Sequence, residues 1–219
     1  MTASHQPFAR WMIFGAVGLL LGVAGCGRNL SLAEDAYLTG LLGPTLDTSA
    51  IRVSSTGGIR AVTDAPPKLM VPRQALNCQV PADTRAVRPP TAIALFDTIW
   101  VSPVLHYENL MVDWPERIPL ARAILLAHEA THVWQWQNRD ITGYSPYAAM
   151  MENVRSRDPY SYELEPGKGF LEYGFEQQGR IVGDFVCETA ADPHSERTAA
   201  LRALLVPVFG PGASLTGRN

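Results

Sequence analysis

The sequence contains little lysine and little cysteine. Two of its 18 basic residues are lysines, Lys68 and Lys168, and three cysteines occur in 219 residues. It has no cluster of basic side chains that would predict nucleic-acid binding, and no acidic run that would predict a disordered tail. No two cysteines are spaced as CxxC, which excludes a redox or zinc site of that type. A hydrophobic content of 47% and a net charge of -3 fit one globular domain, or one domain with a long appendage.

The long apolar run of this chain lies at its N-terminus. Arg10 precedes residues 11–25, which are all apolar or small. A charged segment followed by such a run is typical of a signal peptide, and the run is short for a bilayer-spanning helix. It ends at Cys26 in Val-Ala-Gly-Cys, which resembles the bacterial lipobox. The resemblance implies that residues 1–25 are removed and that Cys26 is lipidated, which would anchor an exported lipoprotein to a membrane.

Gly27 follows this cysteine, in place of the aspartate associated with inner-membrane retention. We therefore expect a location in the bacterial cell envelope, at the periplasmic face of the outer membrane. The alternative is an ordinary signal peptide or membrane anchor with an incidental cysteine. Disulfides persist in exported proteins, so Cys78 and Cys187 are candidates for a disulfide, with two free buried thiols as the alternative.

The composition changes near residue 90. Residues 26–90 are interrupted by Gly, Ser and Pro, and we expect a tether or covering segment with a short helix over 33–42. We expect residues 91–206 to form the folded domain and residues 207–219 to form a C-terminal tail. Branched and aromatic residues over 91–96 and 98–101 predict a short hairpin or one bent strand.

Four helices are predicted in the remainder of this domain. The last should begin with Asp192 as its N-cap and Pro193 in its first turn, and should stop before Pro207. The first, over 118–138, is apolar nearly all round, which is typical of a buried helix. The predicted ranges are 118–138, 147–154, 168–188 and 193–205.

The helix predicted over 118–138 contains the motif HExxH, as His128-Glu129-Ala130-Thr131-His132. Positions i and i+4 lie on one face of a helix, so both imidazoles can bind one metal ion. Two nitrogen ligands, an open coordination position and a carboxylate base are what zinc-dependent hydrolysis requires. We therefore predict one Zn²⁺ per chain and Glu129 as the general base. An inert helical glutamate is the alternative for Glu129.

A catalytic zinc ion normally has three protein ligands. A metzincin would have Gly at 135 and His at 138, where this chain has Gln135 and Asn138. We predict Glu176 as the third ligand, because Gly179 and Gly183 lie on the same helical face and would let another helix approach closely. The alternatives are a solvent-facing Glu176, or ligation by another glutamate: Glu163, Glu165 or Glu172.

Three later segments accompany the HExxH motif: Tyr160-x-Tyr162, Gly167-Lys168-x-Phe170 and Glu176-Gln177-Gln178. In the motif and these segments, the chain resembles the minimal gluzincin-like metallopeptidases of the DUF4157 type. The resemblance covers about residues 90–190. It implies that His128, His132 and Glu176 bind the zinc ion. It also implies an α+β, compact zincin-like domain, mainly helical, with a small β-hairpin or sheet and the motif on a long buried helix.

Further side chains are candidates for supporting roles. Tyr160, Tyr162 and His194 could stabilise the oxyanion of a transition state, although packing or surface roles are the more common ones for such residues. Asp184 could orient a ligand histidine, with a plain salt bridge as the alternative. We expect a zinc metallopeptidase that acts on a peptide or protein substrate. The main alternative is a non-catalytic zinc-binding envelope lipoprotein with a structural or interaction role. A third is a processing or toxin-associated protease with one dedicated partner.

Overall fold

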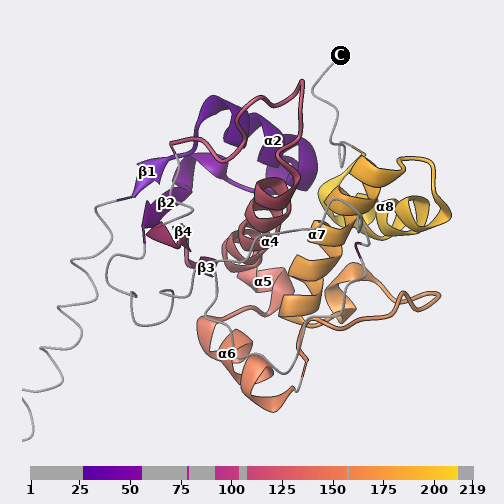
Figure 1. Cartoon of the computed structure of the whole chain (residues 1–219). Helices are drawn as coiled ribbons and strands as arrows, with labels where there is room; N and C mark the ends of the chain where they lie inside the picture. Colours follow the sequence, from indigo (N-terminus) through magenta and orange to yellow (C-terminus); the bar gives the residue numbers. More distant parts are fainter. Residues whose placement is uncertain (1–26, 56–77, 79–91, 104–107, 157, 212–219) are drawn as a thin grey trace, which may run out of the picture.

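The fold is known from a computed structural model, which describes residues 27–55, 78, 92–103, 108–156 and 158–211. A small sheet lies on one side of a central helix, and further helices lie on the other side (Figure 1). The fold class is therefore α+β and mainly helical, as predicted. The predicted signal peptide and the lipidation site at Cys26 lie outside the described residues.

The described part of the chain contains four strands, six α-helices and three short 3-10 turns. The strands are β1 (Arg28–Asn29), β2 (Arg52–Ser55), β3 (Ala92–Leu95) and β4 (Thr98–Val101). The helices are α2 (Leu32–Leu42), α4 (Leu120–Gln137), α5 (Arg139–Thr142), α6 (Pro146–Arg155), α7 (Phe175–Ala191) and α8 (Glu196–Phe209). The 3-10 turns are Gly43–Thr45, Thr48–Ala50 and Phe170–Glu172.

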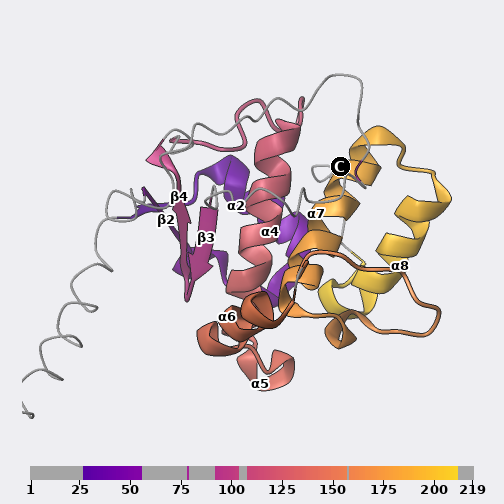
Figure 2. The same ribbon diagram turned by 60° about the horizontal axis from the view of Figure 1, so that its bottom comes forward.

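The sheet has the order β1-β2-β4-β3. The hairpin predicted over residues 91–101 is present: β3 and β4 pair antiparallel, with Leu95 opposite Thr98. Strand β2 pairs with β4 in parallel, and β1 pairs with β2 antiparallel. Strand β3 is thus an edge of the sheet, and Figure 2 shows it beside α4.

Helix α4 occupies the centre of the molecule, between the sheet and α7 (Figure 2). Its small residues Ala123, Ala127 and Ala130 are fully buried. Small side chains allow neighbouring backbones to approach, and α4 packs more extensively on α7 than on any other element. The predicted buried helix is therefore present, over Leu120–Gln137.

The expectation of a tether or covering segment over 26–90 is wrong for residues 27–55. These residues form β1, α2 and β2, and α2 buries Tyr37, Leu38, Leu41 and Leu42 completely. The hydroxyl of Tyr37 donates to the carbonyl of Ala123 in α4, at 3.0 Å. This part of the chain is a component of the core, because its apolar side chains belong to the same buried cluster as those of α4 and because α2 packs on α4.

Two helix boundaries also differ from the prediction. Helix α7 begins at Phe175 rather than near 168, after the 3-10 turn and Gly174 as N-cap. Helix α8 is capped by Ser195, whose hydroxyl accepts from the N–H of Thr198, and it continues through Pro207 to Phe209. Its last turn is retained despite the proline because Phe209 is buried against the rings of Trp134 and Phe170.

Cys78 and Cys187 form a disulfide, with their sulfur atoms 2.06 Å apart. Cys187 lies in α7, so the bond joins residue 78 to the helix that contains Glu176. Among the described residues, no helix has both the length and the apolar character needed to cross a membrane.

Candidate metal centre

His128 and His132 lie one turn apart on the face of α4 that meets α7. Their Nε2 atoms are 3.2 Å apart. Glu176, in the first turn of α7, brings its Oε2 atom to 3.3 Å from each of these nitrogens. Among the residues that the structure describes, these three form the group of side chains that could hold a metal ion together. The predicted ligand set therefore meets at one point.

Gly179 explains why the two helices come so close. A Cβ atom at this position would lie 2.8 Å from Cε1 and 2.9 Å from Nδ1 of the His128 ring. At Gly183, one turn further along, a Cβ atom would lie 3.3 Å from Cγ2 of Ile124. The predicted approach of another helix to this glycine face is confirmed, and the helix is α4.

The spacing of the three ligand atoms fits a zinc ion. In a tetrahedral site with ligand bonds of about 2.0–2.1 Å, neighbouring ligand atoms are separated by about 3.3–3.4 Å. The three observed separations are 3.2, 3.3 and 3.3 Å. In addition, Oε2 of Glu176 is buried without a hydrogen-bond partner, a costly arrangement that a cation would compensate.

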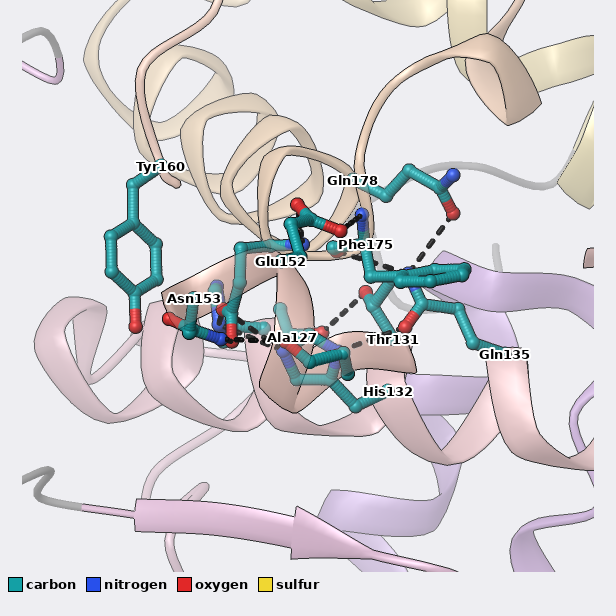
Figure 3. Close-up of polar contacts among 12 residues, drawn as sticks. Ala127, Thr131, His132, Gln135, Glu152, Asn153, Tyr160, Phe175 and Gln178 are labelled. Atoms are coloured by element: carbon teal, nitrogen blue, oxygen red, sulfur yellow. Dashed lines mark hydrogen bonds and ion pairs between the residues drawn. The ribbon is translucent and has the colours of Figure 1, made fainter. Parts of the chain in front are cut away.

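Gln135 determines which nitrogen of His132 is available to a metal. The Nε2 amide group of Gln135 donates to the carbonyl oxygen of Phe175 at 3.0 Å, and a carbonyl can only accept. Its Oε1 atom therefore faces Nδ1 of His132, at 2.8 Å (Figure 3). This contact requires a proton on Nδ1, which leaves the lone pair of Nε2 directed at the ligand group.

Gln178 completes this buried chain of amides. Its Oε1 atom accepts from Nε2 of Gln135 at 3.0 Å, and its own Nε2 group donates to the carbonyl oxygen of Tyr173 at 2.7 Å. Both glutamine side chains are buried. Sequence reasoning assigned neither of them a role. The sequence did hold a signal for Gln135: it is a polar side chain three residues after His132, on a helix face that is otherwise predicted to be buried.

Glu129 lies beside the ligand group and lines the same cavity, which has a volume of about 330 Å³. Its side chain is buried and accepts a hydrogen bond from the backbone N–H of Ala94 in β3. Burial raises the pKa of Glu129, and the nearby imidazoles oppose this shift. A carboxylate whose pKa is shifted upward is a better proton acceptor than an exposed one.

Glu176 and His132 shift each other's pKa values. Burial disfavours the charged form of His132, but the adjacent Glu176 carboxylate outweighs it and raises the pKa of His132 to about 9. Burial likewise disfavours the Glu176 carboxylate, and the two histidines overcome this and lower its pKa. The cluster therefore favours a bound positive charge, which a proton or a metal ion can provide.

Tyr160 is the one predicted oxyanion stabiliser that lines the cavity. Its ring centroid lies 5.9 Å from that of His128, and it lines the cavity together with Glu176. Burial, followed by the charges of Glu176 and Glu129, raises its pKa. Its hydroxyl therefore remains protonated near neutral pH and can donate a hydrogen bond.

Tyr162 and His194 do not line the cavity. The hydroxyl of Tyr162 donates to Oδ2 of Asp184 at 2.8 Å. His194 is exposed in the turn before α8. Neither residue is placed to stabilise charge at the ligand group, so for both the alternative of a packing or surface role holds.

Asp184 does not orient a ligand histidine. It accepts from Nε of Arg180 at 2.7 Å and pairs with Arg197 at 3.8 Å, on another face of α7. The orienting contact that was predicted for Asp184 comes from Gln135 instead.

The fallback glutamates are not part of the centre. Glu165 pairs with Lys168 at 2.7 Å, and Glu172 accepts from the backbone N–H of Gly169. Glu163 is exposed. Glu176 is thus the glutamate that meets the two histidines.

Comparisons with known proteins connect this domain to a secretion-system protein. The chain is 32% identical over 178 residues to the type VI secretion system spike protein VgrG2b of Pseudomonas aeruginosa. The match covers 79% of this chain but 14% of VgrG2b, so the chain spans about a seventh of the length of that relative. The solved effector domain of P. aeruginosa VgrG2b has a similar structure, with a TM-score of 0.53 and 27% identity, over 90% of this chain and 93% of that domain.

These comparisons correct the resemblance inferred from the motifs. No family model matches the chain. The assignment to the DUF4157-type gluzincin-like group is wrong, because the sequence and structure comparisons relate the chain to VgrG2b. The similar proteins are VgrG2b and its effector domain. The short motifs misled because HExxH with a downstream glutamate specifies a way to bind a metal ion, and such a site can occur in more than one family.

Proposed function

We propose that this protein is a zinc-dependent peptidase in which His128, His132 and Glu176 bind the metal ion and Glu129 is the general base. The observation that supports this most strongly is the buried Glu129 carboxylate beside three ligand atoms at tetrahedral spacing. A structural zinc site normally has four protein ligands and needs no base, whereas a catalytic site has three and an open position.

The zinc ion would supply a Lewis acid and would lower the pKa of a water molecule toward neutrality. Glu129 would take the proton of the attacking water and deliver it to the leaving amine, which its raised pKa favours. Gln135 would keep His132 in the tautomer that binds metal. The neutral hydroxyl of Tyr160 would donate a hydrogen bond to the oxyanion that forms from the carbonyl oxygen.

The cavity favours peptide segments with uncharged side chains next to the scissile bond. Strand β3 and helix α6 contribute Ile93, Leu95, Pro146, Ala149 and Met150 to its walls. Apart from Glu129 and the three ligands, its lining has no charged side chain. A charged substrate side chain in this cavity would lose hydration without gaining a partner.

The similarity to the VgrG2b effector domain supports a dedicated protein target for this peptidase. Together with the lipobox-like sequence at Cys26, it leads us to propose an exported lipoprotein that acts in the bacterial cell envelope. The disulfide between Cys78 and Cys187 agrees with export, because disulfides persist outside the cytosol.

Elemental analysis of the chain from residue 27 onward tests the metal site. We expect one zinc ion per chain, which is lost in His132→Ala and in Glu176→Ala. Peptide-library cleavage mapped by mass spectrometry tests the reaction, with Glu129→Gln as the control that keeps zinc and loses cleavage. Zinc binding with no cleavage in any library would instead support the non-catalytic zinc-binding lipoprotein. Cleavage that persists in Glu129→Gln would refute the role of Glu129.

A further inference from the structure

Helix α6 is attached to the rest of the domain in an unusual way. None of its residues is fully buried, and Tyr147 and Val154 are 68% and 71% exposed. Its inner face is only partly buried, so apolar packing holds it less firmly than it holds a core helix. Polar contacts therefore contribute to its position, and two adjacent residues, Glu152 and Asn153, make such contacts with α7.

Glu152 caps the N-terminus of α7 from outside that helix. The N-cap residue is Gly174, which has no side chain to accept the free N–H groups. Instead, the Glu152 carboxylate accepts from the N–H of Phe175 at 2.9 Å and from the N–H of Glu176 at 3.4 Å. A Cβ atom at Gly174 would lie 2.3 Å from Oε1 of Glu152, so glycine leaves the space that this carboxylate occupies.

Asn153 holds the side chain of the proposed third ligand. Its Nδ2 group donates to Oε1 of Glu176 at 3.0 Å and to the carbonyl oxygen of Ala149 at 3.1 Å. Because the carbonyl can only accept, this second bond fixes which end of the amide faces Glu176. With Oε1 engaged, the other carboxylate oxygen, Oε2, faces the two histidines.

We propose that Glu152 and Asn153 are positioning residues for the metal centre, and that through them α6 and the metal site form one coupled unit. Glu152 fixes the helix end from which Glu176 projects, and Asn153 fixes the rotation of its carboxylate. This inference rests on the proposed metal site. Since α6 also forms a wall of the cavity, the residues that would meet the substrate and those that hold the third ligand belong to the same short helix.

Zinc affinity tests the role of Asn153 without any substrate. We expect Asn153→Ala to bind zinc about 10–100-fold more weakly in competition with a chromophoric chelator, which is the usual cost of losing a partner of a metal ligand. Asn153→Asp should weaken binding further, because it cannot donate to the carboxylate and repels it. The matched control is Val154→Ala, whose side chain is exposed and outside the cavity lining, and which should bind as the wild type does.

Amide hydrogen exchange tests the coupling. Zinc should slow exchange in α6 of the wild-type chain, and this protection should be lost in Asn153→Ala while α4 remains protected. Glu152→Gln keeps one acceptor oxygen and should retain more zinc affinity than Glu152→Ala. A zinc affinity of Asn153→Ala within twofold of wild type, or α6 exchange that does not respond to zinc, would overturn the inference. A wild-type chain that binds no zinc would instead refute the proposed function.

Discussion

Gly179 offers the sharpest test of how the two helices form the metal centre. In Gly179→Ala the new methyl group would lie 2.8 Å from Cε1 and 2.9 Å from Nδ1 of His128, closer than stable contacts allow. Such overpacking costs about 1–3 kcal/mol, whereas alanine gains about 1 kcal/mol over glycine in a helix. The net expectation is a loss of about 0–2 kcal/mol in the free energy of unfolding.

The larger effect should fall on metal binding. The His128 side chain is 17% exposed, so its ring can turn away from the new methyl group. This movement relieves the clash but takes Nε2 away from Glu176 and His132. We expect zinc affinity to fall by about tenfold or more, since a ligand histidine that loses its orientation typically costs at least this much. Chemical denaturation and chelator competition on the same preparation measure the two effects separately.

Gly183→Ala is the matched control, one turn further along α7. Its methyl group would lie 3.3 Å from Cγ2 of Ile124, a side-chain atom that can shift by a few tenths of an ångström. Zinc affinity should be unchanged, and the free energy of unfolding should rise by up to about 1 kcal/mol. The reasoning is refuted if Gly179→Ala binds zinc as tightly as Gly183→Ala.

Three further changes have definite expected outcomes. Glu129→Gln should keep one zinc ion per chain, measured by elemental analysis, and should lose peptide cleavage measured on the same sample. Gln135→Leu removes the acceptor that holds Nδ1 of His132, so zinc affinity should fall about 10–100-fold; an unchanged affinity in a folded variant would contradict this role. Removing the disulfide with Cys187→Ser should lower the free energy of unfolding by up to about 4–5 kcal/mol, since the bond closes a loop with a sequence separation of 109. Urea denaturation measures this loss, and equal midpoints with and without reductant would count against it.

The sequence was informative where function depends on local spacing. His128 and His132 are one helical turn apart, so any helix through them brings their rings together. Glu176 could also be predicted, although by a longer argument: two glycines on one helix face indicate a close contact with another helix. The strongly apolar α4 and the β3–β4 hairpin were also predictable, since both depend on contacts between residues that are near in sequence.

The features that could not be predicted depend on contacts between segments that are far apart in the sequence. Strand β2 pairs with β4, and Arg52 is opposite Thr98, so nothing near β2 in the sequence indicates its partner. Residues 27–55 therefore resembled a covering segment rather than part of the core. Gln135 and Asn153 were missed for the same reason, because an amide shows its role only when the distant groups that it bonds are known.

The position of β1 determines how far the cavity beside the proposed metal site could be from a membrane. Gly27 already packs on β2, where an added Cβ atom would lie 2.9 Å from Cβ of Arg52. If Cys26 carries a lipid, as its sequence context predicts, one peptide unit of about 3.8 Å separates the anchor from the folded domain. The β1 edge of the sheet would then rest against the lipid headgroups. The cavity borders the opposite edge, β3, three strand spacings or about 14 Å away. If the chain is the peptidase proposed above, it would act only on protein segments that come within a few nanometres of the bilayer surface.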